Sequence, residues 1–85
     1  MKRRFEILVS LKGGLLDPEG KTIQDLLPTM GWTNVTDVRV GKHIELTVDT
    51  ESEDEATTLV QEMAQRLLSN PVIEEFSILR REEVR

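Results

Sequence analysis

The chain has 85 residues, a formal net charge of -5 and no cysteine. These values favour one small domain and exclude disulfides, thiolate metal sites and cysteine nucleophiles. The acidic excess and the shortage of aromatic side chains argue against nucleic-acid binding. No long apolar run follows the basic start Met1–Arg4, so we expect neither a signal peptide nor a membrane span. We therefore expect the protein in the cytoplasm.

The first segment alternates apolar and polar residues, which predicts a β-strand with one buried face. The exception is Leu8, which lies on the polar side, and Gly13-Gly14 ends the strand. The residues of the expected buried face are Phe5, Ile7, Val9 and Leu11.

A first helix is predicted after this strand. Asp17 can cap its free N–H groups, and Pro18 suits the first helical position. Gly20 weakens the first turn, so we expect the regular helix to begin a few residues later. Pro28 should distort its end and Gly31 should stop it. Its apolar face consists of Ile23, Leu26, Leu27 and Met30.

The next segment predicts a β-hairpin. Val38 and Val40 alternate with polar residues, and the pair Gly41-Lys42 suggests a tight turn. Alternation then resumes over 43–48, which indicates a second strand with one buried face.

A second helix follows, because Ser52 and Glu55 have the spacing of a capping box and apolar residues then recur at helical spacing through Leu68. Asn70 can adopt a left-handed conformation at its end, and Pro71 prevents continuation. A final strand is expected over 72–79, and the charged tail 80–85 is expected to fray.

The order β-α-β-β-α-β predicts an α+β fold over one domain, residues 1–85: a two-layer ferredoxin-like sandwich. Its four-stranded antiparallel sheet would carry both helices on one face. The other face would be open and would carry Leu8, Arg39, His43 and Glu45. We favour a protein contact there over a solvated surface, and pairing of edge strands is a second route to association.

The chain shows no catalytic constellation. The single histidine, His43, has no cysteine partner, and the acidic run 51–55 is explained by the favourable interaction of carboxylates with a helix N-terminus. The residues around Pro18 could form a contact loop, although ordinary helix capping explains them as well. No nucleophile, base and orienting group come together. We therefore expect no cofactor or metal in this chain, and its status as an enzyme in isolation is open.

Segments in the same order and at similar spacing resemble the PurS family, the small subunits of phosphoribosylformylglycinamidine synthase. The likeness runs from the first strand to the last. The segments are Leu11-Lys12 with Gly14, Leu16-Asp17-Pro18-Glu19-Gly20-Lys21, Val38-Arg39-Val40-Gly41-Lys42 with Ile44-Glu45-Leu46, and Leu67-Leu68-Ser69-Asn70-Pro71-Val72-Ile73-Glu74.

This resemblance implies a non-catalytic subunit that bridges a glutaminase, PurQ, and a synthetase, PurL, and assists ammonia transfer between them. It implies a homodimer or higher homo-oligomer, with ATP and magnesium in the large partner subunit. The alternative is a ferredoxin-like regulatory module that binds a small effector at a dimer interface.

From this resemblance and the expected exposure, we predict a set of partner contacts. Arg39 is the foremost of them, because it can bind a partner carboxylate. It could instead form a cross-strand ion pair with Glu45. The full set is Asp17, Pro18, Glu19, Gly20, Arg39, Lys42, His43 and Glu45.

Overall fold

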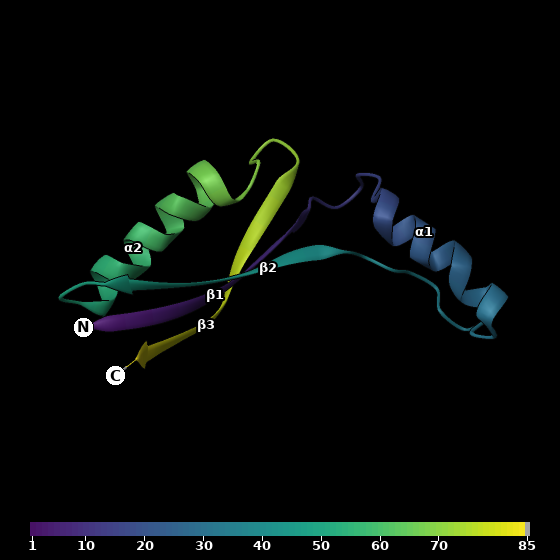
Figure 1. The fold of residues 1–85 in the computed structure, drawn as a ribbon. Coiled ribbons are helices and arrows are strands. Elements are labelled where there is room, and N and C mark those ends of the chain that lie inside the picture. The colour runs from purple at the N-terminus through teal and green to yellow at the C-terminus, as the bar shows by residue number, and fades with distance from the viewer. Residues whose placement is uncertain (85) are drawn as a thin grey trace.

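The computed structural model describes residues 1–84 and has the element order β-α-β-α-β (Figure 1). The strands form one antiparallel sheet of three, in the order β2-β1-β3. Both helices change type at their ends: α1 continues into a short 3-10 helix, η1, and α2 continues into a short π-helix, η2. The elements are β1 (Lys2–Leu11), α1 (Pro18–Leu26), η1 (Leu27–Met30), β2 (Gly41–Asp49), α2 (Glu53–Met63), η2 (Ala64–Leu68) and β3 (Glu74–Val84).

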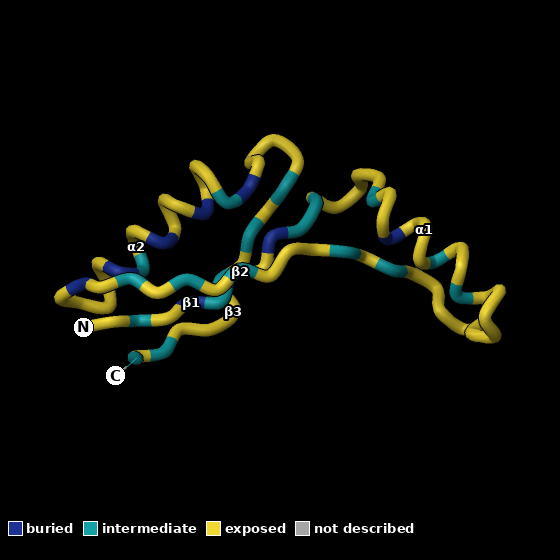
Figure 2. The backbone as a smooth tube through the Cα atoms, viewed as in Figure 1, coloured by how far each residue is buried: buried dark blue, intermediate teal, exposed yellow. Residues whose placement is uncertain are grey.

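The hydrophobic core lies between α2 and one face of the sheet (Figure 2). Phe5, Ile7 and Val9 of β1 are at most 1% exposed, as expected from their alternation. They pack against Ala56 and Val60 of α2, which are fully buried. Partly buried apolar residues of the two outer strands and of η2 complete this core: Ile44, Leu46, Val48, Leu68, Phe76 and Ile78.

The predicted capping box at α2 is confirmed at its first contact, because the Glu55 amide donates to Ser52 Oγ at 3.1 Å. The predicted left-handed conformation of Asn70 is wrong, since no non-glycine residue among 1–84 has a positive φ. Asn70 instead closes a turn into β3: its carbonyl oxygen accepts from Ile73 N at 3.1 Å and Glu74 N at 2.7 Å.

The expected fraying of the tail is wrong for residues 80–84, and Arg85 lies outside the described residues. These residues extend β3 and pair with the beginning of β1, with Arg81 opposite Phe5. A β-bulge shifts the register between Glu6 and Ile7 of β1. The tail is held because β1 is long enough to supply a partner, and a hydrogen-bonded ion pair joins Arg4 to Glu82.

The predicted hairpin at Gly41-Lys42 is wrong. Gly41 is the first residue of a single strand, lies opposite Ser10 of β1, and does not have a positive φ. A Cβ built at Gly41 would lie 2.9 Å from the Val9 carbonyl oxygen, which is closer than real side chains approach. Glycine therefore serves here for close strand approach, as it often does in strand interiors. Residues 33–40 lie outside the sheet, which leaves three strands and not four.

Residues 18–40, here called the arm, extend away from the sheet (Figure 1). The chain measures 52 × 29 × 14 Å, and its radius of gyration is 16.5 Å, whereas a compact domain of this length would have about 12 Å. Only α2 covers the sheet, so the prediction of both helices on one face is wrong for the single chain. The α+β class stands.

The helix of the arm begins at Pro18, with Asp17 as its cap, so the expected delay caused by Gly20 is wrong. Its expected end is confirmed: α1 gives way to η1, which contains Pro28, and Gly31 follows with a φ of 102°.

Candidate interaction site at the base of the arm

Where the arm leaves and rejoins the rest of the chain, hydrogen bonds to one carboxylate hold its two ends together. Asp17 Oδ2 accepts from Val40 N at 2.7 Å, and Asp17 Oδ1 accepts from Gly20 N at 2.9 Å. The hydrogen bond from Val40, then that from Gly20, and the nearby positive charge of Arg39 lower the pKa of the Asp17 carboxyl. We call this group of Asp17, Gly20, residues 38–40 and Leu11 the elbow.

Gly20 lies inside the elbow and is buried. A Cβ built there would overlap the Val38 carbonyl oxygen and lie 2.7 Å from Asp17 Oδ2. The first turn of α1 therefore rests directly on the backbone of the returning chain. Gly20, one of the predicted contact residues, is therefore buried in the elbow, where its lack of a side chain permits this close packing.

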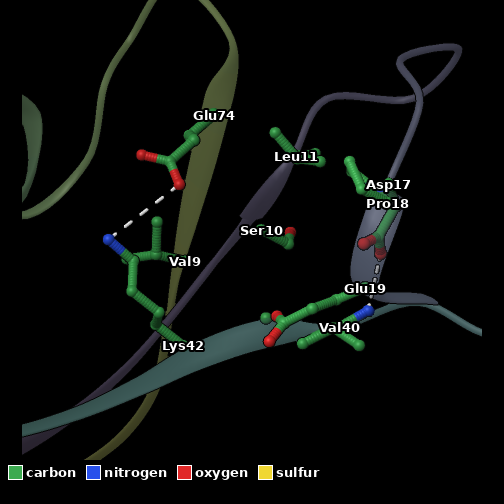
Figure 3. A pocket seen from close by; sticks show the side chains of 10 residues that line it. Val9, Ser10, Leu11, Asp17, Pro18, Glu19, Val40, Lys42 and Glu74 are labelled. Carbon is green, nitrogen blue, oxygen red and sulfur yellow. Dashed lines mark hydrogen bonds and ion pairs between the residues drawn. The ribbon is translucent and has the colours of Figure 1, made fainter. Parts of the chain in front are cut away.

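A hollow of about 360 Å³ lies between the elbow and the end of the sheet (Figure 3). Residues from the ends of the three strands and from the start of α1 line it, and two of them, Lys42 and Glu74, form a long ion pair of 4.0 Å from Nζ to Oε2. Four of the predicted contact residues therefore share one site. The full lining is Val9, Ser10, Leu11, Asp17, Pro18, Glu19, Val40, Gly41, Lys42 and Glu74.

Arg39 lies at a second hollow, of about 330 Å³, which it shares with Leu8 and Glu75. Its guanidinium donates from Nη2 to the Leu11 carbonyl oxygen at 2.9 Å. The alternative prediction of a cross-strand pair with Glu45 is wrong, because Arg39 precedes β2 and Glu45 faces Arg4, whose Nε lies 3.8 Å from Glu45 Oε1.

His43 and Glu45 lie on the sheet face that α2 leaves open, since they pair with Leu8 and Glu6 and not with the core residues of β1. His43 Nε2 is 3.7 Å from Glu6 Oε1. The hydrogen bond from Arg4 lowers the pKa of the Glu82 carboxyl on the same face. This open face carries exposed Leu8 among charged pairs. The larger hollow is on the other face, because its lining residue Lys42 pairs with the core residue Val9.

The arm carries an apolar stripe that sequence reasoning assigned to the core. Leu26 is 55% exposed and Met30 is 67% exposed, and both lie on the surface together with Ile23 and Trp32. Helical spacing of apolar residues does not distinguish a helix that packs on its own sheet from one that packs on another chain. The apolar signal was therefore present in the sequence, but the expectation that α1 packs on its own sheet is wrong.

Within residues 1–84, no group of three or more His, Asp or Glu side chains could hold a metal ion. No helix in this range is long and apolar enough to cross a membrane. The arrangement that the structure does present is a set of surfaces suited to contacts.

Known proteins match this chain over nearly its whole length. The family model PurS, phosphoribosylformylglycinamidine (FGAM) synthase, matches residues 4–82. The PurS subunit of this synthase from Bacillus subtilis is 42% identical over 73 residues, which is 86% of each chain. The solved structure of PurS from Methanocaldococcus jannaschii, described as one of the subunits of formylglycinamide ribonucleotide amidotransferase in the purine biosynthetic pathway, is 36% identical, with a TM-score of 0.83 over 100% of both chains.

A chain in the structure of PurLQS from Thermotoga maritima is also similar. It is 33% identical, with a TM-score of 0.88, and the match covers 96% of this chain and 99% of that one. Matches of this coverage include the arm as well as the sheet.

Proposed function

Because the chain belongs to the PurS family of phosphoribosylformylglycinamidine synthase subunits, we propose that it is the small, non-catalytic subunit of this ligase in purine biosynthesis. Its proposed partners are a PurL-like synthetase and a PurQ-like glutaminase. The observation that carries this proposal is the family match over residues 4–82, supported by the similarity to a chain of PurLQS. ATP and magnesium are expected in the synthetase, and the proposed location is the cytoplasm.

In this proposal the chain acts as a rigid bridge. The predicted contacts fall into two groups: Asp17, Pro18, Glu19 and Lys42 around the larger hollow, and His43 with Glu45 on the open face. Lys42 and His43 are adjacent in β2, so their side chains point to opposite faces of the sheet. One chain can therefore touch two partners at once. Holding the two catalytic subunits together would shield ammonia from water, where protonation removes its nucleophilicity.

The bridge is proposed to work as a homodimer or higher homo-oligomer. The exposed stripe of the arm needs a cover, and the large radius of gyration indicates that this chain alone does not provide one. The outer edge of β2 is also unpaired, because β2 lies at the edge of the sheet. A second copy would cover the stripe by packing its α2 against this arm, and it would satisfy the open edge of β2 by pairing a strand with it. If two copies exchanged arms in this way, each sheet would carry two helices on one face, as in the predicted ferredoxin-like layer.

Reconstitution tests the assigned role. Adding this chain to purified PurL and PurQ should restore glutamine-dependent synthesis, whereas synthesis driven by added ammonium salt should depend less on it, because free ammonia bypasses the glutaminase. A preparation in which the chain leaves the glutamine-dependent rate unchanged would contradict the adaptor role. Co-purification of the three chains with nucleotide and glutamine is the direct measure of assembly.

Arg39 offers a sharper test of the contact surface. Its guanidinium lies beside a hollow and keeps donors for a partner carboxylate beyond its bond to Leu11 O. We expect Arg39→Glu to weaken co-purification while the circular dichroism spectrum stays unchanged. Arg66→Glu, which alters an exposed arginine on η2, is the matched control. Equal assembly by both variants would remove Arg39 from the interface.

The alternative proposal is an effector-binding regulatory module. The observation in its favour is the hollow of about 360 Å³ at the elbow, which is at the small end of the range for ligand sites, about 300–1,000 Å³. Stabilisation of the isolated chain against heat by an amino acid or a nucleotide would favour this alternative.

A further inference from the structure

The direction of the arm is determined by few contacts in this chain. The helix α1 lies beyond the end of the sheet, and its apolar stripe is exposed (Figures 1 and 2). A helix that does not pack on the core would swing freely if only a flexible loop joined it to the sheet. The elbow is the place where this freedom can be removed.

We infer that the Asp17 side chain is a latch that fixes the direction of the arm relative to the sheet. One oxygen holds the start of α1 through Gly20 N, and the other holds the returning chain through Val40 N, one residue before β2 begins. The carboxylate therefore ties the start of the arm to its end, at the residue that directly precedes Gly41, the first residue of β2 paired with β1. This role is separate from ordinary helix capping, which needs only the first of the two bonds.

Two neighbouring contacts make the latch stiff. Gly20 allows α1 to lie directly on the Val38 carbonyl group, where any side chain would intrude. Arg39 Nη2 binds the Leu11 carbonyl oxygen at 2.9 Å, which joins the returning chain to the end of β1. The elbow thus holds both segments that connect the arm to the sheet.

The inference predicts that the arm can be loosened without unfolding the core. Asp17→Ser separates the two functions of the residue, because a serine oxygen can still cap α1 through Gly20 N but is too short to reach Val40 N as well. Asp25→Ser is the matched control: it makes the same substitution within α1, at an exposed acid whose partner is Lys21 at 2.8 Å. Neither change touches the residues that α2 buries.

The measurement is a distance distribution between two spin labels within one full-length chain. The sequence has no cysteine, so cysteines introduced at the exposed positions Asn34 and Glu51 would be the only labelled sites. Dilution with unlabelled chain isolates distances within a protomer. The parent and Asp25→Ser should give one narrow distribution, and Asp17→Ser should broaden it about twofold or more.

An unchanged, narrow distance distribution in Asp17→Ser would overturn the inference. This result would be expected if a second copy, and not Asp17, holds the arm. Circular dichroism and amide-exchange protection at Val60 check that the core is intact. If Asp17→Ser does not fold, Asp17→Asn serves in its place, since an amide has one acceptor oxygen for two N–H groups. Broadening in that variant supports the latch, and an unchanged distribution overturns it. The test uses this chain alone, so it is independent of the proposed function.

Discussion

The stripe on the arm makes a quantitative prediction for self-association. Leu26 is 55% exposed in the single chain, and full burial of a leucine side chain stabilises by about 2 kcal/mol. Covering the exposed half in a dimer therefore contributes about 1 kcal/mol per copy, or about 2 kcal/mol for both copies of a symmetric dimer. Because 1.4 kcal/mol is a tenfold change, Leu26→Ala should raise the dimer dissociation constant by about 30-fold.

Sedimentation equilibrium over a dilution series measures this constant. Alanine preserves the helix, so α1 should remain intact in the variant. Leu79→Ala is the matched control, because Leu79 is 57% exposed but lies in β3 at the bulge. Equal dissociation constants for the two variants would refute the view that the arm is covered by a second copy.

Three further predictions concern the chain itself. Val60→Ala, which removes two methyl groups from a fully buried side chain, should lower the free energy of unfolding by about 2 kcal/mol in urea titrations; an unchanged midpoint would contradict the assigned core. Ser52→Ala should cost about 1 kcal/mol through loss of the bond from Glu55 N, and Ser52→Asp should restore it. Folding lowers the pKa of Asp17, so its stabilising effect is complete above the unfolded value, about 3.9, and is lost as pH falls through the lowered value. The difference in unfolding free energy between the parent and Asp17→Asn should therefore shrink below about pH 4, and a difference that stays constant in acid would argue against this origin.

The sequence alone determined the features that depend on near neighbours. Alternation identified the buried face of β1, Ser52 located the start of α2, and Asp17 was identified as the cap of α1, although that helix begins earlier than expected. Capping and periodicity act within a few residues, so they are legible before the chain folds. The spacing of the family-like segments likewise pointed to the PurS family without any structure.

Only the tertiary structure decided that α2 packs on the sheet and that the apolar stripe of α1 does not. A helix with the stripe of α1 can pack on its own sheet or on another molecule, and periodicity is identical in the two cases. Gly41 suggested a turn, but the close approach of β1 made it the start of a strand. The tail 80–84 is ordered because it pairs with the beginning of β1, almost 80 residues away in the chain. These outcomes depend on contacts between distant segments, and local patterns carry no information about which of those contacts form.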